Sequence, residues 1–139
     1  MANNLANNRL PNLVLVAQIN SYFCGPASLQ MLFSFHHVII DQQQVVDLLQ
    51  INQKIVNHGI TLQEMGQFVK EFYPQFQFWY KFNSTIPELS QLVNDFNCPV
   101  GVEWQGIFDY PDEEAFDDED DDPGHVAVIT GINTSDNYI

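Results

Sequence analysis

The order of helix and strand signals constrains the fold of this chain more than any other feature. Amphipathic segments that open with helix-capping residues come first, and short apolar segments typical of strands come last. Asp41 precedes Gln44 by three residues, and Thr61 precedes Glu64 by the same interval, which is the spacing of a capping box. This order predicts an α+β domain in which N-terminal helices pack on an antiparallel sheet.

The expected boundaries follow from capping residues, prolines and apolar spacing. Helices are expected from Cys24 to about His37, from Asp41 through Leu49, from Thr61 to Phe72 before Pro74, and from Ser84 through Phe96. Strands are expected at Phe76–Phe82, Cys98–Trp104 and His125–Ile132, while Leu13–Ala17 is either a short strand or an extended entry.

Length and charge bound the class of protein. The 139 residues suit one domain, residues 1–139, with a loose Asn-rich lead-in over residues 1–12 and an acidic loop over residues 109–123. The net charge of −14 is local, because ten of the 18 acidic residues lie between Asp109 and Asp122. Only four Lys and Arg residues are present, which argues against nucleic acid and anionic membrane as partners. No apolar run is long enough for a signal or membrane segment, so we expect a cytoplasmic protein with reduced thiols.

Cys24 lies at the predicted start of the first helix, within the run Gln18-Ile-Asn-Ser-Tyr-Phe-Cys-Gly-Pro-Ala-Ser-Leu29. Unpaired N–H groups and the helix dipole favour a thiolate at such a position. The Gln18 amide and the Cys24 N–H are candidate donors to an oxyanion, and Gly25 is expected to leave room for a substrate backbone. The alternatives are a buried core cysteine and an ordinary exposed glutamine.

Four histidines are candidates for the base that takes the thiol proton. His36 and His37 lie at the other end of the Cys24 helix, about 18 Å away, and cannot reach the thiol. His58 precedes Gly59 in an expected loop, where an exposed histidine is ordinary. His125 opens an apolar strand, where a base is held firmly while facing a cleft, so His125 is the candidate, with a rim histidine as the alternative.

These residues resemble a known family. Gln-x5-Cys-Gly-Pro-Ala-Ser-Leu, followed by Gly-His-Val-Ala-Val-Ile-Thr-Gly-Ile-Asn, is similar to the bacteriocin-processing cysteine peptidases that cut after double-glycine leaders, and most similar to their stand-alone relatives. The resemblance extends over nearly the whole chain from Leu15. It implies a papain-like fold with Cys24 as nucleophile, His125 as general acid–base and Gln18 as oxyanion donor. We expect a peptide or protein substrate and neither a cofactor nor a metal; the double-glycine preference does not carry over.

The chain departs from the family pattern at its end. Family members orient the histidine with an acidic residue on the strand after the His strand, usually in an Asp-Pro pair. A hairpin centred between Thr134 and Ser135 would place position 144 opposite His125, about five residues beyond Ile139. We therefore expect either a truncated piece of a working enzyme or a protein without this residue, whose turnover would fall by about 10⁴ while the fold stays intact.

Three functions stay open at this point. They are a thiol hydrolase acting on a peptide or amide bond, an inactive papain-like module that binds a peptide, and an acyl or peptidyl transferase. The acidic segment is either a cation site or a solvated loop; Pro123 and Ile129 would take the glycine and glutamate positions of an EF-hand, so we expect the loop. Cys98 is expected in the core, and Trp104 in the core or in the wall of the cleft.

Overall fold

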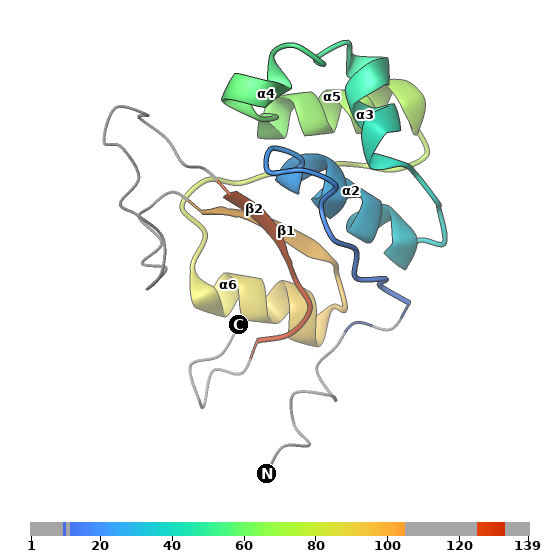
Figure 1. Cartoon of the computed structure of the whole chain (residues 1–139). Coiled ribbons are helices and arrows are strands. Elements are labelled where there is room, and N and C mark those ends of the chain that lie inside the picture. Colours follow the sequence, from blue (N-terminus) through green and yellow to red (C-terminus); the bar gives the residue numbers. More distant parts are fainter. Residues whose placement is uncertain (1–9, 11, 105–124, 133–139) are drawn as a thin grey trace, which may run out of the picture.

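The structure is a computed structural model, and it describes residue 10, residues 12–104 and residues 125–132. Within these residues the elements are α2 (Cys24–Phe35), α3 (Gln42–Leu49), α4 (Ile55–His58), α5 (Leu62–Phe72), α6 (Ile86–Ser90), η1 (Gln91–Asp95), β1 (Val100–Trp104) and β2 (His125–Ile129). Figure 1 shows α2 between the helices α3–α5 and the sheet, with α6 beyond the sheet. This arrangement confirms the predicted α+β class.

Local capping residues set the helix starts. The Asp41 carboxylate accepts hydrogen bonds from the N–H groups of Gln43 and Gln44 at the start of α3, and the Gln44 side chain completes the predicted capping box. Thr61 and Glu64 form the same box at the start of α5. A further box, formed by Thr85 with Glu88, opens α6.

The fourth predicted helix is observed as two joined elements. The chain runs through α6 and continues without a break into η1, a π-helical segment that ends at Asp95. The wider π turn puts Val93 in the interior, where 1% of its surface is exposed, while Phe96 just after η1 is 66% exposed.

The expected strand at Phe76–Phe82 is wrong. No strand is assigned there, and Trp79, Tyr80 and Phe82 are exposed. The Tyr80 ring contacts those of Phe78 and Phe82 instead, at centroid distances of 6.5 and 5.8 Å. Alternation of aromatic residues favours a strand only where the segment pairs with another strand, and the sheet of the described residues consists of β1 and β2 alone.

The N-terminal segment follows the second of its two expected forms. Residues 13–17 are not assigned to a strand, so Leu13–Ala17 is an extended entry. Leu10, within the expected lead-in, is buried, and its N–H donates to the carbonyl oxygen of Thr130 at 3.2 Å.

Among the described helices, none is long and apolar enough to cross a membrane.

The strands β1 and β2 pair in antiparallel register, with Trp104 opposite His125 and Val100 opposite Ile129. Helix α2 packs on β2 and, on its other side, on α3.

Buried side chains form two groups. The helical cluster consists of Phe23, Leu29, Phe33, Ile40, Val45, Val46, Ile55, Ile60, Met65, Phe68, Val69 and Val126. The sheet cluster consists of Leu10, Leu13, Val93, Ile129 and Ile132.

Candidate active site

Cys24 is the first residue of α2, as predicted. No side chain caps this helix, and Pro26 in its first turn has no N–H, so the N–H groups of Cys24 and Gly25 are left without a side-chain acceptor. The Cys24 thiol is half-buried and lies at the positive end of the helix dipole. A thiolate is favoured in such a position.

The expected role of Gly25 is wrong. Gly25 is buried, and a Cβ atom built on it would lie 2.0 Å from Cγ2 of Ile60 and 3.7 Å from Sδ of Met65. The absence of a side chain therefore lets the first turn of α2 pack against the segment that leads into α5. It makes room for the core of the protein on that side and not for a substrate backbone.

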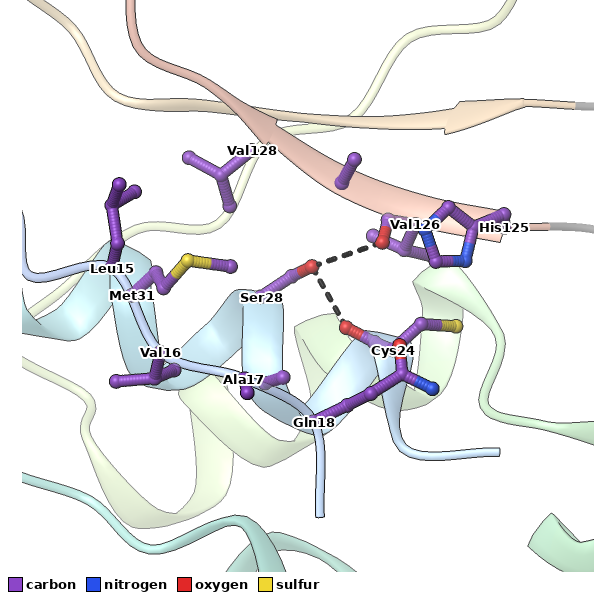
Figure 2. A pocket seen from close by; sticks show the side chains of 12 residues that line it. Leu15, Val16, Ala17, Gln18, Cys24, Ser28, Met31, His125, Val126 and Val128 are labelled. Atoms are coloured by element: carbon purple, nitrogen blue, oxygen red, sulfur yellow. Dashed lines mark hydrogen bonds between the residues drawn. The ribbon is translucent and has the colours of Figure 1, made fainter. Parts of the chain in front are cut away.

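His125 is the first residue of β2 and is half-buried. The antiparallel register places it opposite Trp104, the last residue of β1, at one end of the sheet. Figure 2 shows the His125 ring and the Cys24 sulfur at the same end of a pocket. The fold thus brings together a thiol and an imidazole that are a hundred residues apart in the chain.

The pocket has a volume of about 460 Å³. Its walls are the extended N-terminal segment, the first two turns of α2 and the strand β2 (Figure 2). Cys24, His125 and Gln18 line it, and so do the mainly apolar residues Leu15, Val16, Ala17, Ala27, Ser28, Met31, Val126, Ala127 and Val128. The three predicted site residues therefore share one cavity.

Gln18 extends from the N-terminal segment toward the Cys24 end of the pocket (Figure 2). Its Nε2 atom donates a hydrogen bond to the carbonyl oxygen of Asn20 at 2.7 Å. The same carbonyl accepts from the N–H of Phe23, the residue before Cys24, at 3.4 Å. One amide hydrogen of Gln18 is thereby fixed against the turn that leads into α2, and an amide group carries a second hydrogen that can serve a ligand.

Gln42, which the sequence did not single out, holds the chain on both sides of Gln18. Its Oε1 accepts from the N–H of Ile19 at 3.0 Å, and its Nε2 donates to the carbonyl oxygen of Ala17 and to Oε1 of Gln30, both at 2.9 Å. The Gln42 residue is 4% exposed. A buried polar group with every bond satisfied fixes local geometry, and here it fixes the backbone that carries Gln18.

The other histidines lie elsewhere, as predicted. His36 follows α2 and contacts the rings of Phe35 and Phe76, and His37 is exposed in a left-handed conformation with φ of 60°. His58 is exposed, but the expectation of a loop is wrong because His58 ends the short helix α4. None of these three lines the pocket.

Cys98 is exposed, so its expected place in the core is wrong. The expected strand begins two residues later, at Val100, and Cys98 lies in the connection after η1, where its N–H donates to the carbonyl oxygen of Leu92 at 2.9 Å. The two thiols therefore differ in environment: Cys24 is half-buried in a pocket and Cys98 faces solvent.

No group of three or more His, Cys, Asp or Glu side chains in the described part of the chain is arranged to hold a metal ion. The acidic segment Asp109–Asp122 and the turn expected around Thr134 and Ser135 lie outside the described residues, as does the Trp104 side chain. Among the carboxylates that the structure describes, those with a shifted pKa, Glu64 and Glu88, belong to capping boxes and do not line the pocket.

A thiol at a helix start and an imidazole at a strand start, facing one cavity, form the kind of pair with which cysteine-dependent hydrolases carry out nucleophilic catalysis. The Peptidase_C39 like family matches residues 11–139, and the chain belongs to this family. Comparison with curated proteins and with solved structures gives no significant match. Family membership indicates a cysteine peptidase-like function with peptides as substrates.

Proposed function

We propose that the protein is a cysteine peptidase with a papain-like active site. Cys24 is its nucleophile, His125 its general acid–base, and Gln18 with the Cys24 N–H its oxyanion donors. The observation that carries the proposal is that these residues, which come from the N-terminal segment, α2 and β2, line the same pocket. Within this proposal, the chain is a relative of the bacteriocin-processing peptidases.

In the first half of the reaction, His125 takes the thiol proton and the sulfur attacks the carbonyl carbon of a peptide bond, forming a C–S bond. Negative charge develops on the carbonyl oxygen, where the free Gln18 amide hydrogen and the Cys24 N–H stabilise it. As the C–N bond breaks, His125 gives its proton to the leaving amine. The acyl group is left on Cys24 as a thioester.

In the second half, water attacks the thioester carbon and His125 takes a proton from that water. The C–S bond breaks, the carboxylic acid leaves, and the proton returns to the sulfur. An amine in place of water would give a new amide, which is the transferase alternative. Product composition with and without an added amine separates the two.

The lining of the pocket bears on the substrate. Leu15, Met31 and Val128 give the end of the pocket away from the thiol an apolar surface (Figure 2), and burying apolar groups is favourable at about 25 cal/mol per Å². The proposed substrate is therefore a peptide that carries apolar side chains some residues away from the bond that is cut.

Competitive alkylation of the full chain with limiting iodoacetamide at pH 7 tests the proposal. Cys98 is the more exposed thiol, so accessibility alone predicts that Cys98 reacts first. A free thiol is only a few per cent thiolate at pH 7, whereas a thiol paired with an imidazolium is largely ionised. We expect Cys24 to react about tenfold faster than Cys98, allowing for the lower nucleophilicity of a stabilised thiolate.

His125→Ala is the matched variant, since it removes the imidazole and leaves both thiols. Its Cys24 rate should fall to that of Cys98, and both rates should become equal in denaturant. Hydrolysis of a peptide library by the wild type, and none by Cys24→Ala, completes the test. Faster labelling of Cys98 in the native wild type would overturn the proposal, and peptide binding without hydrolysis would favour the inactive binding module.

A further inference from the structure

Ser28 is a buried hydroxyl at the base of the pocket to which the proposed mechanism gives no role. It lies one helical turn after Cys24, and none of its surface is exposed. Its single hydroxyl hydrogen is shared between two carbonyl oxygens, that of Cys24 at 2.8 Å from Oγ and that of Val126 at 3.3 Å (Figure 2). One oxygen atom thus links the residue that carries the thiol with the residue after His125.

The two contacts differ in origin. A serine in a helix commonly bonds the carbonyl four residues earlier, so the contact with Cys24 follows from the helix itself. The contact with Val126 joins residues 98 positions apart and exists only because α2 packs on β2. It lies at the start of β2, where a small displacement of the strand moves His125 relative to Cys24.

We propose that Ser28 is a positioning residue, which sets the placement of the Cys24 thiol relative to the His125 imidazole by tying the first turn of α2 to the start of β2. The inference rests on the proposed thiol–imidazole pair. Catalytic pairs tolerate little displacement, because a shift of about 1 Å can cost about 10²-fold in rate. A single short link beside both residues is suited to prevent that shift.

Helix α2 offers an internal control in Ser34. Its Oγ donates to the carbonyl oxygen of Met31 at 2.6 Å and accepts from the N–H of Val14 at 2.9 Å, so it also ties α2 to a distant segment. Ser34 does not line the pocket. Ser28→Ala and Ser34→Ala therefore remove the same hydroxyl from the same helix, and only the first loses the link beside the thiol and imidazole.

The experiment measures the rate of Cys24 alkylation by iodoacetamide from pH 5 to pH 9, with Cys98 as the internal reference. For Ser28→Ala we expect the advantage of Cys24 over Cys98 at pH 7 to fall about three- to tenfold. Ser34→Ala should retain the wild-type profile. Ser28→Thr keeps the hydroxyl and should restore most of the advantage.

The outcomes separate the inference from the proposed function. A wild-type profile in Ser28→Ala, or equal changes in the two serine variants, overturns the positioning role while the peptidase proposal stands. A wild-type profile in His125→Ala overturns both, since no imidazole would then act on the thiol. Urea unfolding of each variant shows whether it is folded at the labelling conditions, and a Ser28→Ala effect confined to unfolded protein also overturns the role.

Discussion

The helical cluster and the sheet cluster differ in how far apart along the chain their members lie. Apart from Val126, the helical cluster draws on residues 23–69, which α2, α3, α4 and α5 and the residues that flank these helices supply in order. The sheet cluster unites Leu10 and Leu13 with Val93 and with Ile129 and Ile132, from three distant parts of the chain. β2 contributes Val126 to one cluster and Ile129 to the other, so β2 and the pocket along it lie where the two clusters meet.

Polar contacts repeat this contrast. In the helical layer, capping boxes join residues three positions apart, as in Thr61 with Glu64. Around the pocket and the sheet, side chains bond to distant backbone groups: Gln42 to Ala17, Ser28 to Val126 and Asn94 to Ile132. The helices of the helical layer can therefore be predicted from residues close together in the sequence, whereas the site depends on contacts that only the folded chain makes.

The largest effect is expected from Phe68→Ala in the helical cluster. Phe68 is fully buried, and its ring contacts those of Phe33, Phe72 and Tyr73 at centroid distances of 6.2, 5.5 and 5.6 Å. Removing a buried phenylalanine leaves a cavity and costs about 3–5 kcal/mol of unfolding free energy, measured by urea denaturation. Phe72→Ala, at a site that is 37% exposed, is the control and should cost clearly less; equal losses would contradict the assigned core.

A smaller loss of unfolding free energy is expected from Asn94→Ala, which removes a contact near β2. The Asn94 side chain donates to the carbonyl oxygen of Ile132 at 2.8 Å and accepts from its N–H at 3.3 Å, which ties η1 to the chain just after β2. Losing both bonds should cost about 1–2 kcal/mol. Exchange of backbone amide hydrogens should be accelerated more in β2 than in α5.

Gln91→Ala is the control for this change, because Gln91 is exposed in the same η1 segment. Its exchange pattern should match that of the wild type. Uniform loss of protection across α5 and β2 in Asn94→Ala would show that the two regions unfold as one unit, and the contrast between local and distant contacts would then not extend to stability.

The smallest effect is expected from Glu64→Gln and depends on pH. Partial burial opposes ionisation of Glu64, but hydrogen bonds from Lys54 and from the Thr61 N–H, together with the Lys54 charge, outweigh it and lower its pKa from 4.5. A lowered folded-state pKa stabilises the protein above the unfolded-state value, and this contribution is lost as the pH falls through the folded-state pKa. Glutamine keeps the capping box and removes the charge.

The unfolding free energy of Glu64→Gln should therefore be lower than that of the wild type at pH 7 by less than about 1 kcal/mol, and the difference should vanish toward pH 3. Urea denaturation across this range measures it. Glu71→Gln, an exposed position on the same helix α5, should show no such pH dependence. A difference that persists at pH 3 would contradict an ionic origin.

Sequence reasoning succeeded where neighbouring residues decide the structure. Asp41 and Thr61 cap the helices that they were predicted to cap, and the strands at Val100–Trp104 and His125–Ile129 pair as an antiparallel sheet. It failed at Phe76–Phe82, where alternation suggested a strand but no partner strand lies alongside in the described sheet. Alternating aromatic residues show that a segment is suited to a strand, but they do not show whether a partner strand lies beside it.

The candidate site shows the same division. Cys24, His125 and Gln18 were singled out by residue type and spacing, and they line one pocket. Gln42 was missed because a glutamine near a helix start is ordinary in sequence, and only burial reveals that it holds the chain around Gln18. Gly25 was misjudged because the sequence does not show which side of the helix Ile60 occupies.

The sequence by itself determined where α2, α3 and α5 start, that the segments around Val100–Trp104 and His125–Ile129 form strands, and which side chains can supply a thiol, an imidazole and an amide. Those properties depend on bonds within a helical turn and on the chemistry of single residues. Tertiary structure alone decided that α2 packs on β2, that a pocket opens between them, and that Ser28 reaches the backbone beside His125. The physical reason is that contacts across a hundred residues depend on how whole clusters of buried side chains pack, which no short stretch of sequence specifies.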